Sequence, residues 1–245
     1  MRYSKVKEKL ILLFDGKKLA AMPEEWGFIN EDNREIGRIG FAVNLTPETI
    51  IKAVNRKADL FITHHPSVFE MKEKCDELLR KHNLIHAFFH APLDDAEFGN
   101  SHSLAAALGL TDCKKSIPYE NGYYWGVTGR FQKAVTFERL KEKLSEILNE
   151  PLKVYKNNNV SIHKVCINAG GGDAIPKLQE AIKDDCDVYI TGGYNLEFLL
   201  YAKYRKISLL IGSHTNTELF GIQNAALLLA AKTNIETFRI EESNC

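Results

Sequence analysis

The sequence predicts an α/β protein built from two related lobes with mostly parallel sheets. The main observation is an internal repeat in which strand, turn, helix, acid and strand follow one another twice along the chain. Such a repeat is informative about the whole fold, because each copy is expected to form one structural unit. Strands that alternate with helices of this length form βαβ units, whose strands pair in parallel.

The first copy of the repeat occupies residues 38–65. An apolar strand is predicted over 39–43, followed by a helix whose N-cap is Thr46 and whose first-turn proline is Pro47. Asp59 then precedes a second apolar strand. The order of these features gives one strand–helix–strand unit.

The second copy occupies residues 164–193 and has the same order of features. Its strand leads into a glycine-rich turn at 170–172, and Asp187 precedes its second strand. We interpret the turn as a tight strand-to-helix connection, the weaker alternative being a phosphate cradle. Gly192 and Gly193 stand where the first copy has a histidine pair, which indicates that only the first copy uses that loop for ligands.

The segment 119–130, rich in glycine and aromatic residues, separates the two copies. We therefore expect a first lobe over 1–125 and a second over 126–212. The length of 245 residues suits one or two domains, since domains usually run to about 100 to 150 residues.

Charge and composition exclude several classes of protein. Lys plus Arg and Asp plus Glu are both 32, and this balance argues against a nucleic-acid binder, although a local basic patch around Lys114, Lys115 and Arg130 stays open. The N-terminal apolar run 10–14 is too short for a signal sequence or a membrane span of about 20 residues. We expect a cytoplasmic protein with no membrane partner.

The five cysteines are scattered, odd in number and never arranged as CxxC. This spacing predicts neither a disulfide framework nor a thiolate zinc site, so we expect reduced thiols.

Histidines and acids follow the predicted strands, where ligands of open α/β sheets bind. They are His64 and His65 after one strand, His90 and Asp94 after the next, and His214 and Glu218 after a strand near the C-terminus. Each group taken alone has a simpler explanation, such as a surface pair or a helix ion pair. Their joint occurrence at strand ends of a repeated unit favours a metal site.

We predict that two divalent ions, Zn, Fe or Mn, lie between the lobes and are bound by His64, His65, Asp94, His214 and Glu218. Successive strand side chains point to opposite sides, so the histidine pair is expected to serve two ions rather than one. A carboxylate can bridge two ions, and Glu218 is the candidate bridge.

The spacing does not settle His90, for which second-shell and acid–base roles both stay open. A helix from residue 214 would bring His214 and Glu218 to one face, whereas Pro92 argues against a regular helix between His90 and Asp94.

Four motifs resemble the Nif-three-like family of dinuclear-metal proteins, the YbgI-like proteins that carry the name GTP cyclohydrolase 1 type 2 homologue. The motifs are FITHHP at 61–66, HAPLD at 90–94 with GN at 99–100, DVYITG at 187–192 and HTNTE at 214–218. The resemblance covers nearly the whole chain.

The resemblance implies that His65, Asp94 and Glu218 hold one ion and that His64, His214 and Glu218 hold the other. It also implies a ring-shaped homohexamer and a first lobe completed by the C-terminal segment 213–245. Two departures from the family pattern concern substrate binding: Asn44 stands where an aspartate is usual, and Gly193 stands in an otherwise Asp-containing loop.

Two functions remain as hypotheses. The first is a metal-dependent hydrolase acting on a nucleotide, as the family name GTP cyclohydrolase implies, or on another phosphate ester. The second is a non-catalytic, metal-stabilised hexameric scaffold or interaction protein.

Overall fold

The computed structural model describes residues 1–242 and divides into two compact units. The first unit comprises Met1–Gly99 and the described residues from Gly221 onward, and the second comprises Asn100–Phe220. The boundary expected near residue 125 falls inside the second unit instead. Residues 119–123 of the aromatic segment connect two antiparallel strands of one sheet and residues 124–130 begin the second of these strands, so the segment lies within a unit and is not a linker.

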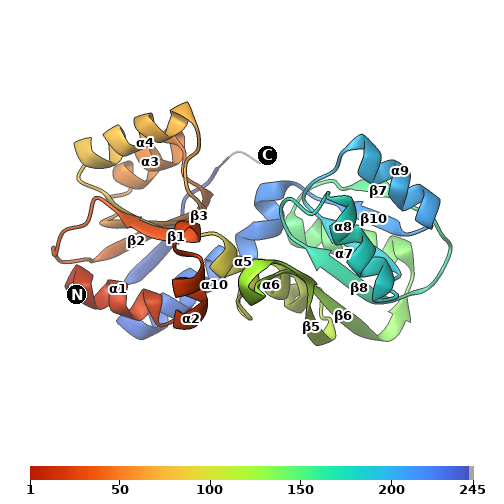
Figure 1. Ribbon diagram of the computed structural model, residues 1–245. Coiled ribbons are helices and arrows are strands. Elements are labelled where there is room, and N and C mark those ends of the chain that lie inside the picture. The colour runs from red at the N-terminus through yellow and green to blue at the C-terminus, as the bar shows by residue number, and fades with distance from the viewer. Residues whose placement is uncertain (243–245) are drawn as a thin grey trace. The chain divides into compact units, whose positions relative to one another are not determined.

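The first unit holds a five-stranded sheet with the order β1-β4-β3-β2-β11. Its strands pair in parallel except for β1, which runs antiparallel to β4 at one edge. Figure 1 shows α3 and α4 over one face of this sheet and α1 over the other. Its elements are α1 (Tyr3–Ile11), α2 (Gly16–Ala21), η1 (Pro23–Glu25), β1 (Trp26–Ile29), β2 (Arg38–Asn44), α3 (Pro47–Asn55), β3 (Leu60–His65), α4 (Glu70–Lys81), β4 (Ile85–Phe89), α5 (Ala91–Asp95) and β11 (Glu236–Arg239).

The second unit holds a six-stranded sheet with the order β5-β6-β8-β9-β10-β7. Here β8, β9 and β10 are parallel, while β5, β6 and β7 add antiparallel pairings, so the sheet is mixed rather than mostly parallel. Its elements are α6 (Asn100–Ala107), β5 (Thr111–Pro118), η2 (Glu120–Gly122), β6 (Tyr124–Val135), α7 (Phe137–Leu148), β7 (Lys153–Tyr155), β8 (Ile162–Asn168), α8 (Ile175–Lys183), β9 (Val188–Thr191), α9 (Leu196–Arg205) and β10 (Ser208–Ile211). Helix α10 (His214–Thr233) begins in this unit and ends in the first.

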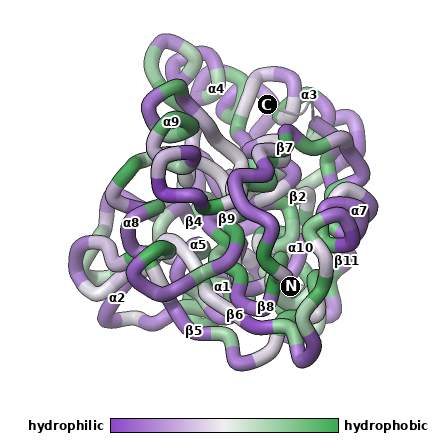
Figure 2. The backbone as a smooth tube through the Cα atoms, turned by 90° about the vertical axis from the view of Figure 1, so that its right-hand side faces the viewer, coloured by the Kyte–Doolittle hydropathy of each residue, from purple (hydrophilic) through white to green (hydrophobic). Residues whose placement is uncertain are grey.

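Side chains that alternate along the strands build a core on each face of the second sheet. Val165 and Ile167 pack with α6 and α7, whereas Cys166, between them in sequence, packs with α8 and α9. Figure 2 shows hydrophobic colour along central strands such as β9. Both faces of the parallel strands are therefore covered, as parallel sheets require.

The predicted repeat is present in the structure. Strands β2 and β3 pair in parallel around α3, and β8 and β9 pair in parallel around α8. The acid of each copy does the same work: Asp59 accepts hydrogen bonds from the backbone N–H groups of residues 37 and 38, and Asp187 accepts them from residues 163 and 164. Thr46 caps α3 as predicted, with a reciprocal bond to Thr49.

Four cysteines, Cys75, Cys113, Cys166 and Cys186, are free thiols, and Cys245 lies outside the described residues. Over residues 1–242, no helix combines the length and the apolar character needed to cross a membrane.

Candidate metal centre

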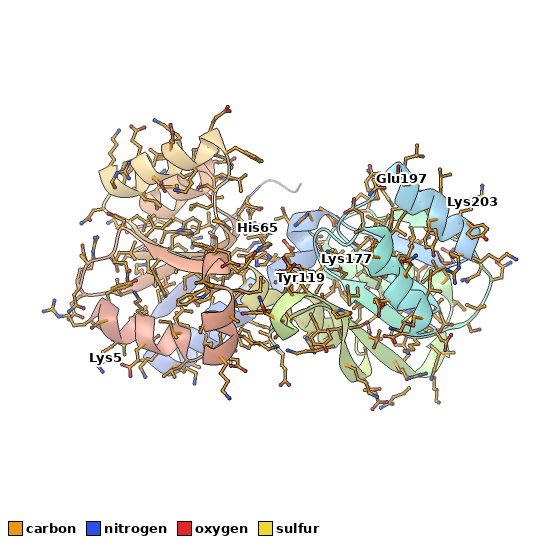
Figure 3. The ribbon with its side chains drawn as sticks, in the orientation of Figure 1. Lys5, His65, Tyr119, Lys177, Glu197 and Lys203 are labelled. Atoms are coloured by element: carbon orange, nitrogen blue, oxygen red, sulfur yellow. The ribbon has the colours of Figure 1, made fainter. Side chains whose placement is uncertain are left out.

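The histidine pair lies at the carboxyl end of β3, in the first unit. His64 is fully buried and its Nδ1 lies 3.0 Å from the backbone oxygen of Phe89, while Nδ1 of His65 lies 2.8 Å from Oδ1 of Asn44. Figure 3 labels His65. The two ring centroids are only 4.3 Å apart. The rings do not point to opposite sides, because β3 ends at His65 and Asn44 holds its ring beside that of His64. That the pair serves two ions stays a prediction.

His90 joins this pair from the next strand along the sheet. It follows β4, and its ring centroid lies 5.0 Å from that of His64 and 5.2 Å from that of His65. Its Nδ1 lies 2.5 Å from Oε2 of Glu25, whose backbone oxygen also accepts the His90 N–H. One ligand nitrogen from each of the three histidines falls within 4.8 Å of the others, so His90 belongs to a group able to hold a metal ion.

Each of these three histidines has an acceptor at Nδ1. A carbonyl, an amide oxygen or a carboxylate there assigns the proton to Nδ1 and leaves the lone pair on Nε2, the form that binds metal. The acceptors are the backbone oxygen of Phe89, Oδ1 of Asn44 and Oε2 of Glu25. Such outer partners are typical of ligating histidines.

A carboxylate anchors the Asn44 amide in turn. Nδ2 of Asn44 donates to Glu242, and this carboxylate also accepts the backbone N–H groups of Val43 and Asn44. The amide orientation follows, with Oδ1 toward His65. Burial raises the pKa of Glu242, and the hydrogen bonds from Val43 and Asn44 oppose that shift.

Asp94 lies in the short helix α5, with Oδ1 3.8 Å from Nε2 of His64. The side chain is only 6% exposed, so a carboxylate is held next to a buried imidazole. The prediction that Pro92 prevents a helix here is wrong. Pro92 lies in the first turn of α5, where its missing N–H costs no helical hydrogen bond.

His214 and Glu218 lie in the second unit, on the first turn and a half of α10. As the i, i+4 spacing predicts, they share a face, with 3.2 Å between Nε2 of His214 and Oε2 of Glu218. Glu218 is 3% exposed. Gly170 provides the room: a Cβ there would lie 1.8 Å from Oε1 of Glu218, and its φ of +69° favours glycine.

Glu150 and Thr217 hold the start of α10, and no sequence pattern predicts either role. Glu150 accepts hydrogen bonds from the backbone N–H of Ser213 at 2.6 Å and from Nδ2 of Asn216 at 2.8 Å. Oγ1 of Thr217 accepts the Gly170 N–H at 2.9 Å. His214 and Glu218 are thus borne on a helix start tied to two neighbouring turns.

The sheet registers refine the repeat at these positions. Thr63 pairs with Phe88 in the first unit and Thr191 pairs with Ile211 in the second. Counting two residues on from Phe88 and Ile211, the counterpart of His90 is Ser213, one residue before His214. His90 and His214 are therefore not equivalent positions in the fold, although each has an acid four residues further on.

Fold and side chains together define a class: a two-unit α/β protein with imidazole and carboxylate groups suited to divalent ions such as Zn, Fe or Mn. The comparisons name the family. The model of the Duf34/NIF3 family (NGG1p interacting factor 3) matches residues 17–245, so the chain belongs to that family.

Among curated relatives, a Haemophilus influenzae protein named GTP cyclohydrolase 1 type 2 homolog is 28% identical over 204 residues, which are 79% of each chain. Among solved structures, reduced HcgD from Methanocaldococcus jannaschii has a TM-score of 0.85 at 23% identity, over 99% of this chain and 98% of that one. Protein YbgI, described as of unknown function, has a TM-score of 0.85 at 21% identity, over 100% and 99%. These structural likenesses show the shared fold.

Proposed function

We propose that this protein is a metal-dependent hydrolase with two divalent ions held by His64, His65, Asp94, His214 and Glu218. The observation that carries the proposal is the Nδ1 partner of His64 and of His65, which leaves Nε2 of each ring for a metal ion. The carboxylates of Asp94 and Glu218 support it, since each is buried beside a histidine. Divalent ions with such ligands supply Lewis-acid polarisation of a substrate oxygen.

We assign proton transfer to His90. Its hydrogen bond to Glu25 orients the ring, the arrangement of a histidine general acid–base with its orienting carboxylate. His90 is also more accessible than His64, with 35% of its side chain exposed against none. A substrate hydroxyl or leaving group can exchange its proton at Nε2.

The proposed substrate is a nucleotide or another phosphate ester, and the curated relatives named GTP cyclohydrolase 1 type 2 homolog support the nucleotide. The test is hydrolysis of a nucleotide and phosphoester panel, GTP included, by protein loaded with Zn, Fe or Mn. We expect turnover that is lost in His65→Ala, reduced in His90→Gln and unchanged in His163→Ala, an exposed histidine on β8. A fully loaded protein that hydrolyses no member of the panel contradicts the hydrolase.

The alternative, a non-catalytic scaffold, makes the opposite expectation for metal removal. If chelation lowers the melting temperature or splits the oligomer while no panel member is ever hydrolysed, the ions are structural. We propose a homohexamer for either case, on the basis of the family resemblance, and its molar mass by light scattering tests that assembly.

A further inference from the structure

A polar cavity lies in the second unit, away from the strand ends that carry the proposed metal ligands. It has a volume of about 490 Å³, within the range of small-ligand pockets. Lys164 lines it near the start of β8, whereas the Gly170 turn follows the end of that strand. The cavity and the Gly170 turn are therefore at opposite ends of one strand.

Basic side chains dominate the lining of this cavity. Four basic and two acidic residues line it, together with Thr128 and Gly129 of β6. The basic residues are Lys114, Lys115, Arg130 and Lys164, and the acidic ones are Asp112 and Asp184. Lys114 and Arg130 are exposed, so both can reach a bound ligand.

The sheet register brings like charges together. Arg130 of β6 is the direct cross-strand partner of Lys164 on β8, and like charges directly opposite one another are destabilising. Lys164 is partly satisfied, because its ammonium donates to the backbone oxygen of Asp184 at the end of α8. The carboxylate of Asp184 in turn accepts from Ser116. With four basic and two acidic residues, the lining has an excess of positive formal charge, which an anionic ligand would balance.

The backbone of β5 is irregular at the same place. Its register with β6 shifts between Thr111 and Lys114, and Asp112 has a φ of +52°, a left-handed conformation that is uncommon outside glycine. Bulges re-aim side chains and occur often beside functional sites. Gly129 lies opposite the bulge, and a Cβ there would make tight contacts of 3.0 Å with both Cys113 and Leu110.

We propose that this cavity binds a small anion that carries several phosphate groups. Four cations in one cavity match such an anion, because charge-assisted hydrogen bonds to phosphate are the strong ones and arginine can make them in pairs. Asp112 and Asp184 interrupt the basic surface, and the chain as a whole carries no net charge. Both observations favour a confined small ligand over a nucleic-acid strand.

The test is calorimetric titration with sodium tripolyphosphate. Metal-free protein in chelator-treated buffer is used, so that the histidine site cannot contribute and the result is independent of the proposed hydrolase. The variant is Arg130→Gln with Lys114→Gln. The charge-matched control is Lys133→Gln with Lys203→Gln, exposed lysines on β6 and α9 that do not line the cavity; Figure 3 labels Lys203.

We expect binding by the wild type, weakening by roughly tenfold or more in the Arg130 and Lys114 double variant, and little change in the control. Circular dichroism melting curves identify folded variants. No binding at about 1 mM tripolyphosphate, or equal weakening in both double variants, overturns the proposal. A single-stranded oligonucleotide that binds more tightly than tripolyphosphate through the same two residues overturns it in favour of nucleic acid.

Discussion

The first and second units repeat one strand–helix–strand frame and then diverge at the carboxyl ends of its strands. By sheet register, Asn44 of the first unit corresponds to Gly170 of the second, and the histidine pair 64–65 corresponds to the glycines 192–193. In the first unit these positions hold two histidines and Asn44, whose side-chain oxygen is the partner of His65. In the second they are glycines, which leave room for the start of α10.

The glycines exclude what the first unit uses. A Cβ at Gly192 would lie 2.5 Å from Oγ1 of Thr217 and 2.8 Å from Cα of His214. A histidine there would therefore push away the helix that bears His214 and Glu218. At this position of the strand–helix–strand unit, a histidine in the loop and the start of α10 therefore exclude one another. The first unit has the histidine, and the second has the helix that bears His214 and Glu218.

The largest expected effect comes from removing a ligand in the first unit. We expect His65→Ala to weaken metal binding by more than the roughly 10–100-fold typical of outer partners. His163→Ala, in the second unit, serves as the matched control. Elemental analysis and competition with a chromophoric chelator measure the change, and equal metal content in both variants would refute the role of the first unit.

The second prediction concerns the glycine that makes room for Glu218. Gly170→Ala combines a strained positive φ with a clash against Glu218, so we expect a loss of about 2–4 kcal/mol in the free energy of unfolding. Gly171→Ala is the control, because a Cβ there would meet only His214 at 3.6 Å. Urea denaturation measures both. Equal midpoints for the two variants would show that position 170 does not need glycine more than position 171 does.

The third prediction tests the shared frame itself. Asp59→Ala and Asp187→Ala each remove a carboxylate that accepts two backbone N–H groups, so each is expected to cost about 1.5–3 kcal/mol. Glu180→Ala, which removes only a surface pair with Lys183, should cost less than about 1 kcal/mol. Clearly unequal losses at Asp59 and Asp187 would break the equivalence of the two units.

The fourth prediction is a pH dependence of stability that arises from His86 in the first unit. Burial lowers the pKa of His86 to about 3 from 6.5, with Asp76 opposing, whereas its counterpart by register is Leu209. The unfolded chain takes up this proton first, so stability falls as pH drops from 6.5 toward 3, by up to about 1.4 kcal/mol per pH unit.

His86→Leu should remove that part of the slope below pH 6.5 and leave the pH dependence above pH 7 unchanged. Denaturation midpoints of wild type and variant between pH 4 and 8 provide the measurement. Parallel curves would show that His86 is already protonated in the folded chain or does not titrate alone.

Features that depend on residues close together in the sequence could be predicted from it. The Thr46 cap, the two acids at 59 and 187, and the pairing of His214 with Glu218 all follow from spacing within one element or one repeat. The partners of the ligands could not be predicted in this way. Glu25 meets His90 across 65 positions and Glu242 meets Asn44 across 198, and no periodicity links residues so far apart.

The limit at the boundary has a different cause. Glycine and aromatic residues near position 125 are typical of a linker, but the same residue types also suit the turn after β5 and the first half of β6. Only strand pairing separates those readings. Likewise, Pro92 argued against a helix because helix interiors exclude proline, whereas α5 places it in the first turn.

The proposal that two divalent ions bind to this chain is tested by elemental analysis of purified protein, after loading with Zn, Fe or Mn and removal of free metal. We expect about two ions per chain in the wild type. We also expect a clear loss of metal in a His64→Ala, His65→Ala double variant that still melts cooperatively. Wild-type protein that retains no metal, or a double variant with an unchanged metal content, would contradict the proposal.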